Sequence, residues 1–261
     1  MNFNNQVVWI TGASSGIGEA LAKAFNAHGA KVILSARNVK ELQRVQSLLN
    51  SAIPSVIIPF DVQKYMEAET ITKEALRAFG KIDILINNAG LSQRSLSKDT
   101  PFMEELKIIE VDLIATIALT KALLPHLIQQ KGQVVIISSV MGKINTKYRS
   151  AYAAAKHGAV GYFESLRLEL KEDGVNVCNI IPGFIATNIT KNAVGSTAEI
   201  AKNSQNNLGL TPDELATQAI SAIYQRKGNV YIGGFKERAA MILKRLSPSL
   251  FDKFIVKQKV T

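Results

Sequence analysis

The sequence predicts an α/β fold, a doubly wound parallel sheet of about seven strands with helices on both faces. Seven short β-branched runs recur along the 261 residues, and longer helix-compatible segments lie between them. The runs are mostly apolar and do not alternate between apolar and polar residues, as is typical of strands that helices cover on both faces. Right-handed crossovers are expected to connect the parallel strands.

Strands and helices alternate along the chain. The first strand, Val7–Ile10, leads through a glycine-rich turn into a helix that we expect to begin at Glu19. The further strands expected are Val32–Leu34, Val56–Phe60, Ile82–Ile86, Val134–Ile137, Val175–Ile181 and Val230–Ile232. The helices expected are Glu19–His28, Val39–Asn50, Met66–Phe79, Phe102–Gln130, Tyr152–Lys171 and Pro212–Arg226. This alternation predicts βαβ units and parallel pairing.

One catalytic domain is expected over residues 1–234, followed by a basic helical extension over 235–261. Residues 186–210 are rich in Asn, Thr, Ser and Gly between a strand and a helix, which predicts a substrate loop within the domain. The extension holds seven Lys or Arg and two Asp or Glu, so it carries half of the formal charge of +10. The excess of charge is therefore concentrated at the C-terminus.

Two short amphipathic helices are expected in the extension. Pro248 after Ser247 indicates that a second helix begins there, with Pro at its first position and Ser247 as its cap. The apolar face of this helix consists of Leu250, Phe251, Phe254 and Ile255. A basic amphipathic helix can lie on an anionic membrane surface, pack on a second subunit or cover its own domain, and all three alternatives stay open.

The composition is that of a soluble globular protein. The single cysteine, Cys178, forms no internal disulfide. The sequence has no run of about 18 apolar residues and no signal-peptide pattern. We therefore expect a cytoplasmic protein, with peripheral membrane association as an option. The three widely separated histidines predict no metal site. No basic stripe with interleaved aromatic residues indicates a nucleic-acid partner.

A glycine-rich loop follows the first strand. It reads Thr11-Gly12-Ala13-Ser14-Ser15-Gly16-Ile17-Gly18. Glycines allow close approach of the backbone to a ligand, and the N–H groups and dipole at the start of a helix attract a pyrophosphate. Glu19 stands where a mononucleotide P-loop needs Lys, so the pattern favours a dinucleotide.

The second strand ends without the carboxylate that would bind the ribose hydroxyls of NAD(H). Arg37 stands there instead, and its guanidinium suits a 2′-phosphate. The sequence therefore favours NADP(H) over NAD(H). Asp61 and Val62, at the end of the third strand, are expected to contact the adenine ring.

Tyr152 and Lys156 are four residues apart in a segment expected to be helical, which places both on one face. An ammonium beside a phenol favours the phenolate, so the pair predicts an acid/base group. Such a spacing occurs easily by chance, and its weight comes from its context. The preceding strand ends in Ser138-Ser139, at the carboxyl edge where doubly wound sheets bind ligands.

Together these motifs resemble the short-chain dehydrogenase/reductase family, and the C-terminal extension resembles its hydroxysteroid dehydrogenase-like branch. The resemblance covers about residues 7–232 through TGASSGIG (11–18), NNAG (87–90), YAAAK (152–156) with Ser139 13 residues before Tyr152, and PGFIAT (182–187). It implies a Rossmann-like domain and a homodimer or homotetramer. It also implies that Tyr152 exchanges the proton, Lys156 binds the nicotinamide ribose, and Ser139, rather than Ser138, binds the substrate oxygen.

The resemblance extends to the rest of the cofactor site. The cofactor-binding residues that the motifs indicate are Gly12, Ser14, Ser15, Gly16, Ile17, Gly18, Arg37, Asp61, Val62, Asn88, Tyr152, Lys156, Pro182, Gly183, Ile185 and Thr187. Asn87 is expected to tie neighbouring strands. Substrate selectivity is expected in the loop 186–210 and around Gln93–Lys98 and Gly142–Arg149.

The chain departs from the family at Asp112, where the family has an Asn that holds a water beside the catalytic lysine. A carboxylate accepts hydrogen bonds from such a water but lacks amide donors, and it brings a buried charge. A variant relay, a raised pKa of Asp112 and low activity are the alternatives. We expect a working relay, in which Asp112→Asn preserves or raises turnover.

The sequence thus predicts an NADP(H)-dependent oxidoreductase that acts on a moderately apolar ketone or secondary alcohol, steroid-like or retinoid-like. One alternative is a 3-oxoacyl thioester reductase, since basic residues beside the pocket would suit a phosphopantetheine carrier. An alternative of another class is a non-catalytic dinucleotide-binding or sensor protein, which only Asp112 suggests.

Overall fold

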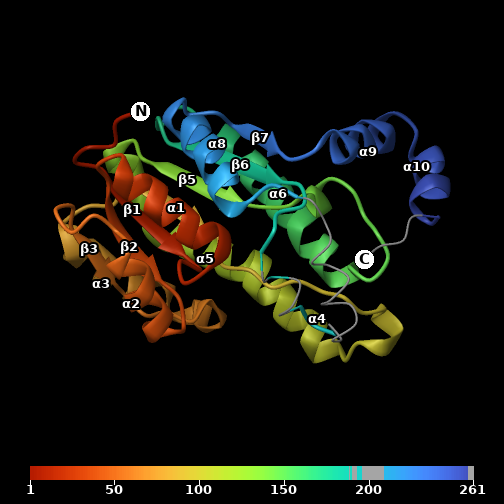
Figure 1. Ribbon diagram of the computed structural model, residues 1–261, viewed down its shortest axis with the longest axis horizontal. Helices are drawn as coiled ribbons and strands as arrows, with labels where there is room; N and C mark the ends of the chain where they lie inside the picture. The colour runs from red at the N-terminus through yellow and green to blue at the C-terminus, as the bar shows by residue number, and fades with distance from the viewer. Residues whose placement is uncertain (188, 190–192, 196–208, 258–261) are drawn as a thin grey trace.

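A computed structural model describes residues 1–187, 189, 193–195 and 209–257 (Figure 1). Its centre is a seven-stranded sheet in the order β3-β2-β1-β4-β5-β6-β7, with every pair parallel. The strands are β1 Val7–Thr11, β2 Lys31–Ser35, β3 Ser55–Ile57, β4 Ile84–Asn87, β5 Gln133–Ile137, β6 Asn176–Pro182 and β7 Asn229–Ile232. The predicted doubly wound α/β fold and its seven strands are confirmed.

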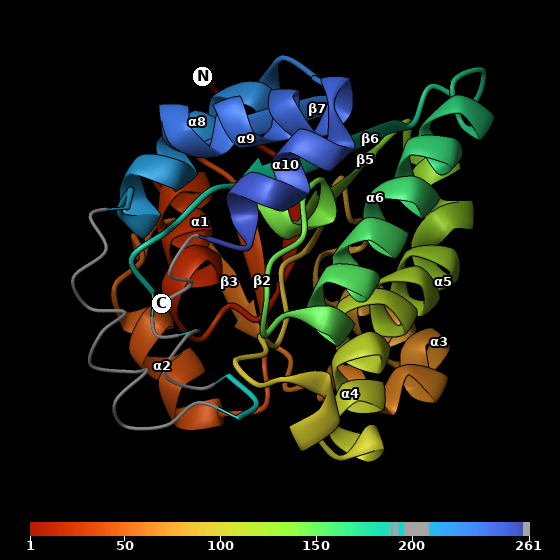
Figure 2. The same cartoon turned by 90° about the vertical axis from the view of Figure 1, so that its right-hand side faces the viewer.

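The α-helices lie in two layers, one on each face of the sheet (Figure 2). The helices are α1 Gly16–Ala27, α2 Val39–Ser47, α3 Ala68–Phe79, α4 Phe102–Ile109, α5 Ala115–Gln130, α6 Ser150–Glu169, α8 Pro212–Tyr224, α9 Phe235–Leu246 and α10 Pro248–Ile255. Helices α1, α2 and α8 share one buried cluster with the sheet, and α3, α5 and α6 share the other. Both faces of each central strand are therefore buried, as the mostly apolar, non-alternating runs predict.

Strand order reverses between β1 and β4. β1 pairs with β2 on one side and with β4 on the other, so the chain leaves β1 and β4 in opposite directions. At such a switch point the connecting loops separate and open a crevice at the carboxyl ends of the strands. The fold therefore fixes where a ligand binds.

Two of the differences between the predicted helices and the structure involve motif residues. The first begins at Gly16 rather than Glu19, so the last two glycines of the loop belong to its first turn. The predicted helix Phe102–Gln130 is interrupted by a π-helical turn at Glu110–Ile114. Such turns are frequent at functional sites, and this one contains Asp112.

Helices α9 and α10 pack beside the carboxyl edge of the sheet. Phe251 of α10 is fully buried in a third apolar cluster that contains Ile108 and Met141. Ser247 is the N-cap residue of α10 and Pro248 is at its first position, as predicted, although the Ser247 side chain makes no capping hydrogen bond. No helix in the described part of the chain has the length and hydropathy to cross a membrane.

Candidate active site

The glycine-rich loop is held against the start of the loop after β4. Gly12 has φ +64°, and a Cβ there would lie 2.8 Å from Cα of Ala89. The Asn88 side chain donates to the carbonyls of Thr11 and Gly12 at 3.0 and 3.1 Å. The Asn87 side chain, by contrast, donates to Thr120 of α5 at 2.9 Å, while its backbone is in register with Ile136 of the neighbouring strand β5.

The N-terminus of α1 has the donors that a pyrophosphate requires. Ser15 is the N-cap residue, and its side chain makes no capping hydrogen bond. The first N–H groups of the helix therefore keep their capacity for a ligand. In the same cavity, the buried Ser138 Oγ has no hydrogen-bond partner in the described structure. Both observations fit a bound dinucleotide.

A single cavity of about 1620 Å³ joins the loop to the predicted catalytic residues. Pockets for drug-sized ligands measure about 300–1,000 Å³, so this one has room for a dinucleotide and a substrate together. The predicted residues that line it are Gly12, Ser14, Ser15, Gly16, Ile17, Arg37, Asp61, Val62, Asn88, Ser139, Tyr152, Lys156, Pro182, Gly183, Ile185 and Thr187. Gly18 and Asp112 do not line it, and much of the predicted substrate loop 186–210 lies outside the described residues.

Tyr152 and Lys156 lie on the cavity-facing side of α6. The Lys156 Nζ is 5.7 Å from the centre of the Tyr152 ring and donates to the carbonyl of Ile137 at 3.3 Å. Ser139, just after β5, accepts a hydrogen bond from the N–H of Met141 at 3.1 Å. Because the hydroxyl oxygen is the acceptor there, the hydroxyl hydrogen of Ser139 can be donated to a ligand.

Asp112 lies behind Lys156, out of the cavity. Its Oδ2 is 3.3 Å from the Lys156 Nζ, and its Oδ1 accepts from the N–H of Leu91 at 2.7 Å. The carboxylate therefore contacts the lysine directly, in an ion pair that is nearly inaccessible to solvent. The predicted water between them is not needed for this contact.

Gly90 fits closely against this ion pair. A Cβ at position 90 would lie 3.2 Å from the Asp112 Oδ1 and 3.5 Å from the Lys156 Nζ. Burial raises the pKa of Asp112, against the opposing effects of Lys156 and the Leu91 N–H. Burial lowers the pKa of Lys156, but the Asp112 carboxylate and, next, Tyr152 raise it by more than burial lowers it. The pKa of Lys156 is therefore raised overall.

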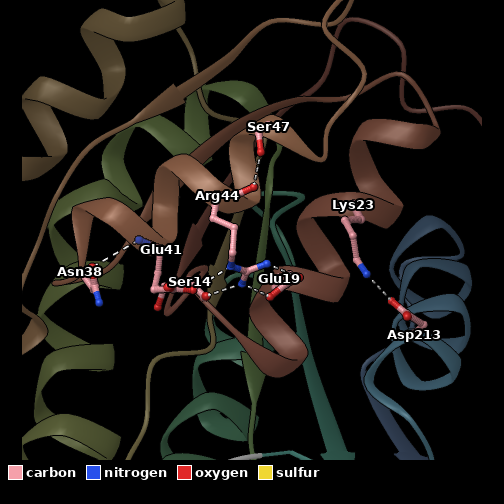
Figure 3. Close-up of polar contacts among 8 residues, drawn as sticks. All are labelled: Ser14, Glu19, Lys23, Asn38, Glu41, Arg44, Ser47 and Asp213. Atoms are coloured by element: carbon pink, nitrogen blue, oxygen red, sulfur yellow. Dashed lines mark hydrogen bonds and ion pairs between the residues drawn. The ribbon is translucent and has the colours of Figure 1, made fainter.

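Two arginines follow the second strand, and they have different partners. The guanidinium of Arg44 donates to Glu19 at 2.6 and 3.1 Å, to Glu41 at 2.7 Å and to the carbonyl of Ser14 at 3.3 Å (Figure 3). Arg44 therefore braces the loop against α1 and α2. Arg37 is exposed, lines the cavity and has no ion pair with any described residue.

A cluster of polar side chains beside Tyr152 is not part of any of the sequence motifs. Gln93 is fully buried, and its Oε1 accepts from the N–H groups of Ala151 and Tyr152 at 2.9 and 3.4 Å, which caps α6. The Arg149 guanidinium lies 5.4 Å from the centre of the Tyr152 ring. The only sequence signal for these residues is their place in the two segments expected to select the substrate.

In the part of the chain that the structure describes, no three His, Cys, Asp or Glu residues are grouped closely enough to bind a metal ion. The sheet, the switch point and the cavity together define the class of nucleotide-binding α/β proteins.

Comparisons with known proteins name the family within that class. The model of the short chain dehydrogenase family matches residues 6–197. Dehydrogenase/reductase SDR family member 7B of Rattus norvegicus is 37% identical over 263 residues, which is 96% of this chain and 80% of that protein. The chain therefore belongs to the short-chain dehydrogenase/reductase family, and the resemblance inferred from its motifs is confirmed.

Solved structures agree with this assignment. An alcohol dehydrogenase from the archaeon Thermococcus sibiricus, complexed with 5-hydroxy-NADP, is 26% identical with a TM-score of 0.77, over 88% of this chain and 97% of its own. A short chain dehydrogenase/reductase of Burkholderia phymatum in complex with NAD has a TM-score of 0.86 over 96% of each chain, at 22% identity, and shows the fold alone. The protein is thus an oxidoreductase with the fold that binds nicotinamide dinucleotides.

Proposed function

We propose that the protein is an NADP(H)-dependent oxidoreductase that interconverts a moderately apolar ketone and its secondary alcohol, with Tyr152 as the acid/base group. The single observation that carries this proposal is the cavity that Tyr152, Lys156 and Ser139 share with the phosphate-binding loop. Val111, Val140, Met141 and Leu243 also line it and favour an apolar substrate, steroid-like or retinoid-like.

The residues divide the proton chemistry between them. The Ser139 hydroxyl donates a hydrogen bond to the carbonyl oxygen and orients it. Tyr152 transfers its hydroxyl proton to that oxygen as the C–H bond forms, and the Lys156 ammonium stabilises the phenolate that remains. When bound, NADPH supplies the hydride to the carbonyl carbon and is oxidised to NADP⁺. The loop residues and Lys156 hold the phosphates and the ribose.

Residues at the two ends of the cavity would position the cofactor. Asn88, Pro182, Gly183, Ile185 and Thr187 line the nicotinamide end. Asp61 and Val62 line the adenine end, beside Arg37. Asp61 is also the cap of the 3₁₀ helix Val62–Glu67, since its Oδ1 accepts from the N–H of Gln63 at 3.1 Å. Its position is thereby fixed.

Arg37 is expected to set the preference for NADP(H). Arg37→Ala should raise the KM for NADPH roughly 10- to 100-fold, because it removes a charged hydrogen bond to the 2′-phosphate, and should change the KM for NADH little. Steady-state kinetics with both cofactors measure this. Lys40→Ala, an exposed cation outside the cavity lining, is the matched control. Equal changes for NADPH and NADH would rule out the role of Arg37.

A carbonyl panel tests the proposed function as a whole. The protein is mixed with NADPH or NADH and with steroid, retinoid and simple ketones and acetoacetyl thioesters, and cofactor oxidation is followed by absorbance. We expect reduction of apolar ketones with NADPH. Turnover of the thioesters far above that of the ketones would favour a 3-oxoacyl thioester reductase. Binding of NADPH without any oxidation, unchanged by Tyr152→Phe, would favour a sensor.

The extension 235–261 stays a separate proposal. Its described helices expose Phe235, Ile242, Leu246, Leu250 and Phe254. These residues and the neighbouring cations are compatible with peripheral contact with an anionic membrane and with a subunit contact in a homodimer or homotetramer. The cytoplasmic location and the boundary at residue 234 likewise remain predictions.

A further inference from the structure

Two arginines project into the cavity beside Tyr152, and neither belongs to the phosphate-binding loop. Arg149 directly precedes α6, and Arg94 lies in the segment after β4 that pairs with Val194. Both side chains line the cavity, although their residues are only 9% and 4% exposed. The end of the cavity at the reacting carbonyl therefore holds two nearly buried guanidinium groups.

No described carboxylate neutralises Arg149. Its Nη1 donates to the Ser92 hydroxyl at 2.6 Å, and its Cζ lies over the Tyr152 ring, 5.4 Å from the ring centre. Asp61, Glu214 and Glu237 line the same cavity, but none of them is within ion-pair distance of Arg149. The one buried carboxylate nearby, Asp112, is paired with Lys156. Several N–H donors of Arg149 are left for a ligand.

The two guanidinium groups act on each other. Burial, and next the charge of Arg149, lowers the pKa of Arg94 to about 10. Burial also lowers the pKa of Arg149. A buried guanidinium such as that of Arg149, which has no paired carboxylate among the described residues, destabilises the folded protein unless an anion compensates its charge. A carboxylate or phosphate of a ligand, bound in the fork of Arg149, supplies that compensation.

From this geometry we propose that the substrate carries a carboxylate or a phosphate close to its reacting carbonyl, and that Arg149 binds this anion. The inference rests on the proposed function and names the substrate class within it. The apolar lining of the same cavity receives the rest of the molecule, so the substrate is amphiphilic. Ser92 orients Arg149 through the 2.6 Å hydrogen bond and acts as a positioning residue.

Matched ketones test the anion site. The carboxylate pair is 4-acetylbenzoate and its methyl ester, and the phosphate pair is 4-acetylphenyl phosphate and 4-methoxyacetophenone. With NADPH, we expect kcat/KM to be at least tenfold higher for the anion than for the neutral partner in one pair or both. The pair with the larger ratio identifies the anion. Ratios near one in both pairs would overturn the inference.

Variants assign the effect to Arg149. Arg149→Gln should lower the anion-to-neutral ratio of kcat/KM at least tenfold, and Arg149→Lys should retain part of it because the charge is kept. Arg94→Gln, which leaves the contact between Arg149 and Ser92 in place, should lower the ratio less. Lys147→Ala, an exposed cation two residues before Arg149 and outside the cavity lining, is the matched control. An unchanged ratio in Arg149→Gln would overturn the assignment.

Binding without turnover separates this inference from the proposed function. In the presence of NADP⁺ a ketone cannot be reduced, so calorimetric titration measures the binding of 4-acetylbenzoate and of its ester to the wild-type protein alone. Preferred binding of the anion, with no reduction by NADPH, would uphold the anion site and refute the proposed function. Equal binding of acid and ester, with reduction of both, would refute the anion site and uphold the function.

Discussion

Tyr152→Phe is expected to lower kcat for ketone reduction by about 10²- to 10⁴-fold, the contribution that a positioned general acid makes. The substitution removes a single hydroxyl and keeps the ring that packs beside Arg149 and Lys156. The loss therefore reports proton transfer rather than repacking. Binding of NADPH should persist, because the loop and Arg37 are unchanged.

Tyr148→Phe is the matched control for this prediction. Tyr148 lies four residues before Tyr152, is 38% exposed and does not line the cavity. Its variant should keep the wild-type kcat. Stopped-flow measurement of NADPH oxidation and fluorescence titration of NADPH separate chemistry from binding. A Tyr152→Phe protein that reduces ketones at the wild-type rate would refute the acid/base role.

The second large effect is expected at the Lys156–Asp112 ion pair. Lys156→Met should lower the free energy of unfolding by about 3–5 kcal/mol, because it leaves the Asp112 carboxylate buried without its partner. It should also remove most of the turnover, since the phenolate of Tyr152 loses its neighbouring cation. Asp112→Asn should preserve or raise turnover, because the ammonium then acts on Tyr152 without an opposing carboxylate.

A double-mutant cycle tests this coupling. The combined variant Asp112→Asn/Lys156→Met should recover much of the stability that Lys156→Met loses but none of its turnover. Urea unfolding of the four proteins gives the coupling free energy, and steady-state kinetics give the turnover. A coupling below about 0.5 kcal/mol would show that the two side chains act independently. A large fall in turnover from Asp112→Asn alone would contradict the variant relay.

The pH dependence of stability follows from the same pair. The contribution of Lys156, whose folded pKa is raised, is present below the ordinary lysine pKa of about 10.4 and is lost as the pH rises through the folded pKa. The folded state also binds the Asp112 proton more tightly than the unfolded state. Stability therefore falls as the pH rises from about 4 through the raised pKa of Asp112, and Asp112→Asn should lack this slope.

Much of the fold follows from local sequence because its signals are local. An apolar, β-branched run such as Val134–Ile137 is typical of a strand buried on both faces. Its place in a parallel sheet can therefore be predicted from these few residues alone. The phosphate-binding loop is predictable for the same reason. The π-helical turn at Asp112 is not, because the contacts of this residue with Leu91 and Lys156 come from distant segments.

The polar cluster beside Tyr152 illustrates the same limit. Gln93 caps α6 through Ala151, at a sequence separation of 58 residues, and Arg149 reaches Ser92 at a separation of 57. No period of hydrophobicity and no motif spacing encodes such pairs. The sequence indicates only that both segments lie near the substrate, and the folded arrangement is needed to see that they create positive charge next to the reacting group.

The binding cavity is completed only when both ends of the chain are in place. The residues that line the cavity range from Gly12 in the first loop to Ile255 in the last described helix, with contributions from the segments that follow each of the seven strands. During synthesis the complete binding site therefore forms only after the C-terminal helices have emerged and docked. Once it has formed, any ligand that occupies the whole cavity stabilises the two ends of the chain together, so its binding energy opposes fraying of the first strand and of the last helices alike.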